Sequence, residues 1–430
     1  MNRFNTLSSE LQSATPTPHT YSSSYKWDSP YKSAGPSVSH PDDVVVCVSI
    51  RTAMTKAKRG GFKDTKTEEM LGPLFQEIFR RTHLKPTDVE DICIGNVLQA
   101  SSALCARMGQ FLGGIPECVP LYTTNRQCSS GLQAIMNIIS SIKSGLIDIG
   151  IAGGVESMSV YTMENALSPE SIATCVFDNE MARNCLIPMG MVSELFSEKK
   201  KFTRTQLDQC GVDSHQKAYR AHKLGLFREE IIPIHTEMID KDGKSHKCVV
   251  DYDDGIRSDT TLESLSRLKS SFKKNGTSHA GNSSQMSDGA AVCLLAKRSK
   301  AEQLNLPIIA KFHGYHVSSM APEMMPTGPA LAIPEVLRKT GLCMGDIDIF
   351  EVNEAFASVA IHTINELNIP THKFNPKGGA IAFGHPLGAT GARQLATLLP
   401  ELRRTHSRYG IVSMCIGTGM GAAAVFENCI

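Results

Sequence analysis

Short, continuous apolar runs recur along the chain from about residue 44 to its end. They cover residues 44–50, 92–94, 147–152, 290–296, 347–352, 410–415 and 422–426. Segments with helical periodicity lie between them: Leu132 and Ile139 share one face of such a segment, and Leu395 and Leu402 share a face of another. Apolar runs of this length, separated by helices, indicate strands buried on both faces of a sheet. The pattern therefore predicts an α/β fold.

The two halves of the chain repeat each other. The segment that begins at Glu77 aligns without a gap with the segment that begins at Glu335. With the same offset, Cys128 falls on Pro386, which is the neighbour of His385. A duplicated fold would therefore bring a nucleophile and a base to related places in its two halves.

The repeat also divides the chain into domains. Gly150 corresponds to Gly410 and Gly289 to Gly421, so the first half contains a long additional segment. A polar insertion of this kind is a natural place for substrate binding, and a structural or dimer-forming arm is the alternative. We expect a first half at 44–156 and 281–308, an inserted loop domain at 157–280 and a second half at 309–430.

Residues 1–43 differ from the rest of the chain. They are rich in Ser, Thr, Pro and Tyr and poor in aliphatic residues. Such a segment cannot bury enough apolar surface to fold alone. We expect a flexible or targeting extension.

The overall composition excludes several classes of protein. The chain has 430 residues, 41% of them hydrophobic and 20% charged, with a net charge of +1. This balance gives no reason to expect nucleic acid or a membrane surface as a partner. No apolar stretch approaches the ~18 residues of a membrane-spanning helix. The 13 cysteines are scattered without a zinc-like spacing, so we expect reduced intracellular thiols and no metal.

Cys128 lies between a strand-like segment at 119–124 and a helix. A thiol at a helix N-terminus faces free N–H groups and the positive end of the dipole, which would lower its pKa by about one unit. The same N–H groups could stabilise an oxyanion. Since most of the thiol would stay protonated near neutrality, a base is still needed, and His385 is the candidate. For Cys128 alone, a buried structural cysteine is the alternative.

Two further residues end buried strands. Asn353 could orient a water or cap the following helix, and Cys415 stands beside the glycine-rich Ile416-Gly-Thr-Gly. His385 itself lies in a glycine-rich loop, but neither a P-loop nor a dinucleotide fingerprint is present to make that loop a phosphate cradle. Open α/β sheets place their sites at strand ends. The four residues therefore predict one shared site.

Taken together, these motifs resemble those of the thiolases, most closely the peroxisomal 3-ketoacyl-CoA thiolases. The resemblance covers nearly everything from residue 44 to the C-terminus. It is carried by Asn125-Arg-Gln-Cys-Ser-Ser-Gly, Gly153-Gly-Val-Glu-Ser-Met, Ala280-Gly-Asn-Ser-Ser-Gln, Asn353-Glu-Ala-Phe, Gly384-His-Pro-Leu-Gly and Cys415-Ile-Gly-Thr-Gly. It implies a five-layered αβαβα fold of two similar halves, with a loop domain inserted in the first, and a homodimer.

The resemblance also implies an activity, namely thiolytic cleavage of 3-ketoacyl-CoA by coenzyme A in β-oxidation. Coenzyme A would be a co-substrate, with no tightly bound cofactor. Cys128 would become acylated, and His385 would take its proton and later activate coenzyme A. Cys415 would protonate the departing enolate. Asn353 would hold a water that forms one oxyanion site with His385, and the backbone N–H groups of Cys128 and Gly417 would form the other.

For coenzyme A binding, the resemblance implies four contacts. Arg257 would lie near the adenine and phosphates, and Ser284 near the pantetheine. Met189 and Met325 would line the pocket. The alternatives are a solvated surface arginine and ordinary core methionines.

The N-terminus departs from the peroxisomal signal Arg-Leu-x5-His-Leu. Arg3-Phe4 and Glu10-Leu11 occupy its positions, and the C-terminus offers no Ser-Lys-Leu. We expect a peroxisomal protein with an import receptor as partner, and mitochondrial or cytoplasmic localisation as alternatives.

Three other functions compete with thiolysis. Biosynthetic acetoacetyl-CoA formation uses the same residues. Decarboxylative ketoacyl synthesis is disfavoured because those enzymes typically lack a second cysteine such as Cys415. The third is a catalytically silent scaffold that binds acyl-CoA or lipid.

Overall fold

The computed structural model describes residues 38–162 and 172–430. Most of the expected extension at 1–43 therefore lies outside the described residues. Within them, a ten-stranded mixed sheet runs through both halves of the chain. The first half contributes β1 (Val44–Arg51), β8 (Ser287–Lys297), β5 (Ile149–Ser157), β3 (Asp91–Gly95) and β4 (Leu121–Thr124), with β2 (Thr55–Lys56) paired to β8. The second half contributes β9 (Ala310–Ser319), β12 (Met420–Asn428), β11 (Tyr409–Ile416) and β10 (Ile347–Val352).

The two halves of the sheet join through a short antiparallel pairing of β1 with β9, in which Val45 faces Lys311. β3 is parallel to β4 and β5, and β10 is parallel to β11. The other pairings within the sheet are antiparallel. Each half therefore has the mixed topology of a strand-helix-strand unit flanked by antiparallel strands.

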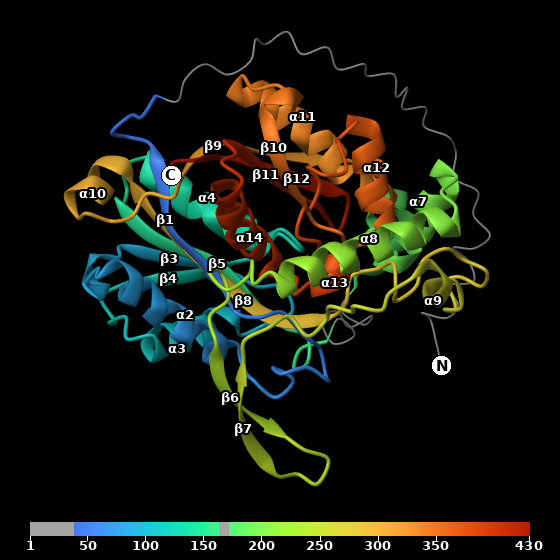
Figure 1. The fold of residues 1–430 in the computed structure, drawn as a ribbon, viewed down its shortest axis with the longest axis horizontal. Helices are drawn as coiled ribbons and strands as arrows, with labels where there is room; N and C mark the ends of the chain where they lie inside the picture. The colour runs from blue at the N-terminus through green and yellow to red at the C-terminus, as the bar shows by residue number, and fades with distance from the viewer. Residues whose placement is uncertain (1–37, 163–171) are drawn as a thin grey trace.

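Helices cover the two half-sheets in layers (Figure 1). One outer layer is α2 (Thr67–Thr82) with α3 (Ser102–Leu112), and α2 shares a core with the first half-sheet. The central layer, α4 (Ser130–Lys143) and α14 (Thr390–Arg404), shares a core with both half-sheets. The other outer layer is α11 (Gly328–Thr340) with α12 (Ala357–Leu367), which packs on the second. The predicted five-layered α/β fold is confirmed.

The repeat seen in the sequence is a repeat of local structure. α2 and α11 both end in the left-handed conformation, at His83 (φ 55°) and Gly341 (φ 70°). A short 3₁₀ turn follows in each case, at Pro86–Asp88 and Met344–Asp346, and leads into β3 and β10. The same sequence of helix, cap, turn and strand therefore builds both halves.

All seven apolar runs are strands, but β9 was not predicted. After its first three residues β9 is only partly buried, and it carries polar residues such as His313 and His316. β9 is held by pairing to β12 and β1 rather than by a continuous apolar run. A hydrophobic pattern reports burial, so a half-covered strand escapes it.

The segment between β5 and β8 carries its own elements. Its hairpin, β6 (Ile234–Ile239) with β7 (Ser245–Val250), projects from the body of the molecule (Figure 1). α8 (Arg204–Lys223) packs against α12 and α13 (Ala380–Phe383) of the second half. The other described elements of this segment are a 3₁₀ turn at Thr174–Asp178, α6 (Glu180–Asn184), α7 (Met189–Lys200) and α9 (Leu262–Ser266). Two short elements follow β8, namely α10 (Arg298–Gln303) and a 3₁₀ turn at Pro322–Thr327.

A buried ionic cluster connects three parts of the chain. Arg51 on β1 lies 2.7 Å from Asp253 and 2.8 Å from Glu230, both of which belong to the segment between β5 and β8. Lys377 of the second half lies 2.9 Å from Glu230. The cluster thus contains two positive and two negative side chains, all of them buried, and their charges compensate one another.

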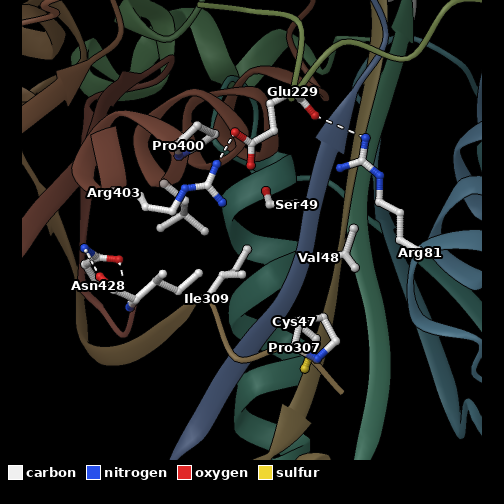
Figure 2. A pocket seen from close by; sticks show the side chains of 12 residues that line it. Cys47, Val48, Ser49, Arg81, Glu229, Pro307, Ile309, Pro400, Arg403 and Asn428 are labelled. Carbon is white, nitrogen blue, oxygen red and sulfur yellow. Dashed lines mark hydrogen bonds and ion pairs between the residues drawn. The ribbon is translucent and has the colours of Figure 1, made fainter. Parts of the chain in front are cut away.

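A surface cavity of about 170 Å³ lies where β1 meets α14 and the C-terminal strand. Figure 2 shows Glu229 at its edge between Arg81 and Arg403. None of the predicted site residues lines this cavity. No helix in residues 38–162 or 172–430 has the length and apolarity needed to cross a membrane.

Candidate active site

Cys128 lies in a tight turn between β4 and α4. Gln127 adopts a positive φ of 46°, which is unfavourable for a side chain other than glycine. The Ser130 hydroxyl holds the turn by donating to the Gln127 carbonyl at 2.6 Å and accepting from the Arg126 N–H at 3.0 Å. The turn thereby places Cys128 one residue before the helix cap, Ser129.

The electrostatic surroundings of Cys128 differ from the expectation. Burial of the thiol raises its pKa, and hydrogen bonds from the backbone N–H groups of Gly417 and Cys128 itself oppose this only in part. The expected net lowering of the pKa is therefore wrong, because desolvation outweighs the N–H groups at the helix start. A base near Cys128 becomes more necessary, not less.

Gly417 follows β11 and turns its N–H toward the sulfur of Cys128. A Cβ at this position would lie 3.6 Å from the Met189 sulfur and 3.9 Å from Gln127, which are ordinary contacts. The contribution of Gly417 is thus its peptide rather than its lack of a side chain. Two N–H groups converge on one sulfur, as an oxyanion site on an acylated cysteine requires.

His385 is buried in the loop between α13 and α14. A Cβ at Gly384, whose φ is 107°, would overlap the Ser287 hydroxyl, so only glycine fits there. The backbone N–H of His385 donates to the backbone carbonyl of Gln285 at 2.9 Å. Its Nδ1 lies 2.6 Å from Thr390 Oγ1 and its Nε2 lies 3.2 Å from Asn353 Nδ2. Burial, with a contribution from Arg393, lowers the pKa of His385 to about 3, so the imidazole is neutral near pH 7.

Asn353 follows β10 and is fully buried. Its backbone N–H donates to the Ser413 carbonyl of β11 at 2.9 Å, which fixes its place beside that strand. α12 begins only at Ala357, so Asn353 is not its cap. The Oδ1 atom of Asn353 has no hydrogen-bond partner among the described residues. A buried carbonyl oxygen in this state is suited to hold a water molecule.

Cys415 is buried on β11. Burial raises the pKa of its thiol strongly, and negative charge on Cys128 raises it further. Cys415 belongs to a small apolar cluster with Met325, and Met189 packs against the same cluster. The structure therefore brings together both cysteines and both predicted methionines.

The loop of His385 packs closely on the first half. A Cβ at Gly131, in the first turn of α4, would come within 2.6 Å of the Gly388 carbonyl oxygen, and a Cβ at Gly154 on β5 would overlap that oxygen. These approaches connect the His385 loop with the helix that follows Cys128. The halves of the repeat thus meet at the predicted nucleophile and base.

Glu156, within the Gly153-Gly-Val-Glu motif, is a residue whose role the sequence did not reveal. Its carboxylate accepts from the backbone N–H groups of Gly388 at 2.9 Å, Val97 at 3.0 Å and Leu98 at 3.2 Å. Burial raises its pKa to about 7. Glu156 fastens two loops of the site to β5.

Of the predicted coenzyme A contacts, Ser284 lies closest in the chain to a residue that contacts His385. The Ser284 N–H donates to the Ala355 carbonyl at 3.0 Å, one residue away from the Gln285 contact to His385. Arg257 is exposed, and its backbone N–H donates to His215 Nδ1 at 3.2 Å. Burial lowers the pKa of His215 to about 4, which keeps this acceptor neutral. The structure therefore places Arg257 at the surface, Ser284 and Met189 in half-buried positions and Met325 in the interior.

Comparison with known proteins decides the family. Residues 44–299 match the N-terminal domain of thiolases, and residues 306–428 match the C-terminal domain. The chain belongs to the thiolase family. It is 52% identical to the human peroxisomal 3-ketoacyl-CoA thiolase over 387 residues, which are 90% of this chain and 91% of that protein. The resemblance inferred from the motifs is confirmed.

Solved structures agree with this assignment. The dimeric peroxisomal thiolase of Saccharomyces cerevisiae superposes with a TM-score of 0.84 at 43% identity, over 91% of this chain and 98% of that one. The acetyl-CoA acetyltransferase of Bacillus anthracis gives 0.81 at 33% identity, over 90% and 99%. This thiolase is therefore more similar in sequence to the yeast peroxisomal enzyme than to the bacterial acetyltransferase.

Proposed function

We propose that this thiolase cleaves 3-ketoacyl-CoA with coenzyme A, releasing acetyl-CoA and an acyl-CoA shortened by two carbons. The observation that carries the proposal is the convergence on Cys128. Its sulfur meets the N–H groups of Cys128 and Gly417, and its negative charge raises the pKa of the nearby Cys415 thiol. His385 lies on the loop packed against the helix that follows Cys128, and Asn353, which follows β10, lies 3.2 Å from the His385 ring. Carbon–carbon cleavage requires a nucleophile, a base, donors for an oxyanion and an acid, and these groups can supply them.

In the first half-reaction, Cys128 gives its proton to His385 and its sulfur attacks the 3-keto carbon. His385 and a water held by Asn353 Oδ1 form one oxyanion site, which stabilises the negative charge that develops on an oxygen of the substrate. The backbone N–H groups of Cys128 and Gly417 form the second oxyanion site. The bond between carbons 2 and 3 breaks, which leaves the acyl group on Cys128. Cys415 protonates the enolate of acetyl-CoA, and its raised pKa keeps it a protonated thiol until then.

After the enolate is protonated, His385 passes the proton that it took from Cys128 to the Cys415 thiolate, so both groups regain their starting states. In the second half-reaction, coenzyme A gives its thiol proton to His385 and attacks the acyl group. Cys128 leaves as thiolate and takes that proton from His385, and the shortened acyl-CoA departs. We propose that Arg257 and Ser284 bind coenzyme A as a co-substrate, and that Met189 and Met325 line its pocket. The exposed guanidinium of Arg257 suits phosphate, and the buried Met325 with the half-buried Met189 suits an apolar chain.

We further propose the division into a first half (44–156 and 281–308), an inserted domain (157–280) and a second half (309–430). The packing of α8 on α12 and α13 supports a role for the insertion in covering the site. Peroxisomal localisation is proposed because the similar human and yeast proteins are peroxisomal. The N-terminal signal positions, Arg3 to Leu11, and with them the import receptor contact, lie outside the described residues.

A homodimer is proposed from one exposed face. Leu104, Phe111 and Leu112 of α3 are 48–62% exposed, beside the edge strand β4, whose only neighbour among the described residues is β3. A second copy would cover this apolar surface and the open strand edge. Leu104→Glu with Phe111→Glu should give monomers by light scattering, whereas Leu146→Glu, at a residue 77% exposed elsewhere, should not. A dimer unchanged by the double substitution rules this face out.

The test of the activity uses 3-ketohexadecanoyl-CoA and intact-mass analysis. Wild-type protein should gain the mass of one acyl group and release acetyl-CoA when coenzyme A is absent. Cys128→Ala should abolish both, and Cys118→Ala, at an exposed cysteine outside the site, should abolish neither. Turnover retained by Cys128→Ala would contradict the assignment of Cys128 as the nucleophile of thiolysis. Comparison with acetoacetyl-CoA separates degradation from synthesis, since a synthetic enzyme should strongly favour the short substrate.

A further inference from the structure

We infer that Thr390 is a positioning residue that fixes the tautomer of His385, with the proton on Nδ1 and the lone pair on Nε2. The inference rests on the proposed role of His385 as the base. Thr390 is fully buried in the first turn of α14, five residues after His385.

The hydroxyl of Thr390 stands between two partners. Its Oγ1 lies 2.9 Å from the Pro386 carbonyl oxygen and 2.6 Å from His385 Nδ1. A carbonyl oxygen only accepts hydrogen bonds, so two oxygens at this distance require the hydroxyl proton between them. Thr390 has no second proton to give. Nδ1 must therefore donate to Oγ1, which assigns the proton to Nδ1.

The contact at Nε2, on the opposite edge of the His385 ring, supports the same tautomer. Asn353 Nδ2 lies 3.2 Å from His385 Nε2, and an amide nitrogen donates. The reverse amide orientation would require a proton on Nε2, which the Thr390 geometry excludes. With the amide in this orientation, Asn353 Oδ1 stays free to hold the water that the proposed mechanism needs. One arrangement of protons thus satisfies all three side chains.

This arrangement decides whether His385 can act as a base. Because the imidazole is neutral near pH 7, the availability of a lone pair toward Cys128 depends on the tautomer rather than on protonation. With Nδ1 held by Thr390, the lone pair is on Nε2, and Nε2 can take the thiol proton once the Asn353 N–H turns away from it. The resulting imidazolium then presents that proton to the developing oxyanion. The other tautomer would present N–H to the thiol and could not accept its proton.

The fold also allows a clean substitution at this position. In Thr390→Val the methyl replaces the hydroxyl at nearly equal volume. The Pro386 carbonyl still accepts from the N–H groups of Ala389 at 2.9 Å and Thr390 at 3.0 Å, so no acceptor is orphaned. The loss is confined to the partner of Nδ1.

A matched control is available on α12. Thr363 is fully buried and its hydroxyl donates to the Val359 carbonyl at 2.8 Å, in the same four-residue pattern as Thr390, without a histidine partner. Thr363→Val should leave kcat unchanged. Thr390→Val should lower the rate of Cys128 acylation and kcat by about 10- to 100-fold, with little change in KM for coenzyme A. Thr390→Ser should restore most of the rate.

The tautomer itself is measured by NMR with ¹⁵N-labelled histidine, with His385 assigned from the His385→Gln variant. Wild-type protein should show a proton on Nδ1, and Thr390→Val should shift the population toward Nε2–H. A wild-type proton on Nε2, or an unaltered acylation rate in Thr390→Val, would overturn the inference. If wild-type protein shows Nδ1–H but forms no acyl-enzyme, the proposed function fails while the tautomer assignment stands.

Discussion

Glu230→Gln tests whether the buried ionic cluster holds the three parts of this thiolase together. Glu230 accepts from Arg51 at 2.8 Å, from Lys377 at 2.9 Å and from the Thr397 hydroxyl at 2.9 Å. The substitution keeps the shape of the side chain and removes its charge. One positive charge is then left uncompensated in the interior.

The expected magnitude follows from the geometry. Charge centres about 4 Å apart attract by about 4 kcal/mol at an effective dielectric constant of 20, so two such pairs contribute about 8 kcal/mol. Burial of the Glu230 carboxylate costs several kcal/mol, which the glutamine no longer suffers. The net loss in the free energy of unfolding should be about 3–5 kcal/mol.

The neighbouring residue supplies the control. Glu229 pairs with Arg403 at the surface, where both side chains are nearly half exposed. Exposed pairs of this kind contribute about 0–1 kcal/mol. Glu229→Gln should therefore leave stability almost unchanged, although it removes the same charge one position earlier in the chain.

The assay is equilibrium unfolding in guanidinium chloride, followed by far-UV circular dichroism and by activity. Glu230→Gln should shift the midpoint strongly to lower denaturant, and addition of Lys377→Met should recover part of the loss because charge balance returns. Equal shifts for Glu230→Gln and Glu229→Gln would refute the reasoning, because buried and exposed charge would then cost the same.

Two further predictions concern pH and loop packing. The pKa of each of three buried histidines is lowered below the value of about 6.5 in an unfolded chain, to about 4, 4 and 3 for His215, His362 and His385. Each histidine therefore binds more protons in the unfolded chain below pH 6.5 and by itself lowers the free energy of unfolding by about 1.4 kcal/mol per pH unit as pH drops from about 6 to 5, whereas buried carboxyls with a raised pKa, such as Glu156 at about 7, act in the opposite direction. His362→Gln should remove the contribution of one histidine from the pH dependence of the guanidinium midpoint, and an identical pH dependence in wild-type protein and variant would contradict the reasoning. Gly154→Ala should displace the Gly388 carbonyl and with it the His385 loop, lowering kcat at least about tenfold. Gly345→Ala, whose Cβ would meet nothing nearer than 3.8 Å, should leave kcat unchanged, and equal activity in both variants would show that the close packing at Gly154 is not required.

Much of this protein could be read from its sequence. Strands buried on both faces of a sheet produce continuous apolar runs, so all seven of the predicted strands are present. The duplicated segments at Glu77 and Glu335 form equivalent helices because the same local residues form the same caps and turns. The residues with chemical character, such as Cys128 and His385, stood out by their type and by their place at strand ends. Local pattern carries this information because periodicity and turn chemistry act over a few residues.

The tertiary structure decided what depends on distant neighbours. The helix start at Cys128 suggested a lowered pKa, but desolvation by the surrounding fold raises it. Glu156 and Thr390 showed no signal of their own, since their roles come from the Gly388 loop and the ring of His385. β9 could not be predicted from its own residues, because its pairing with β1 and β12 is what makes it a strand. Proton positions and charge energies are set by groups far apart along the chain, and only folding brings those groups within hydrogen-bond distance.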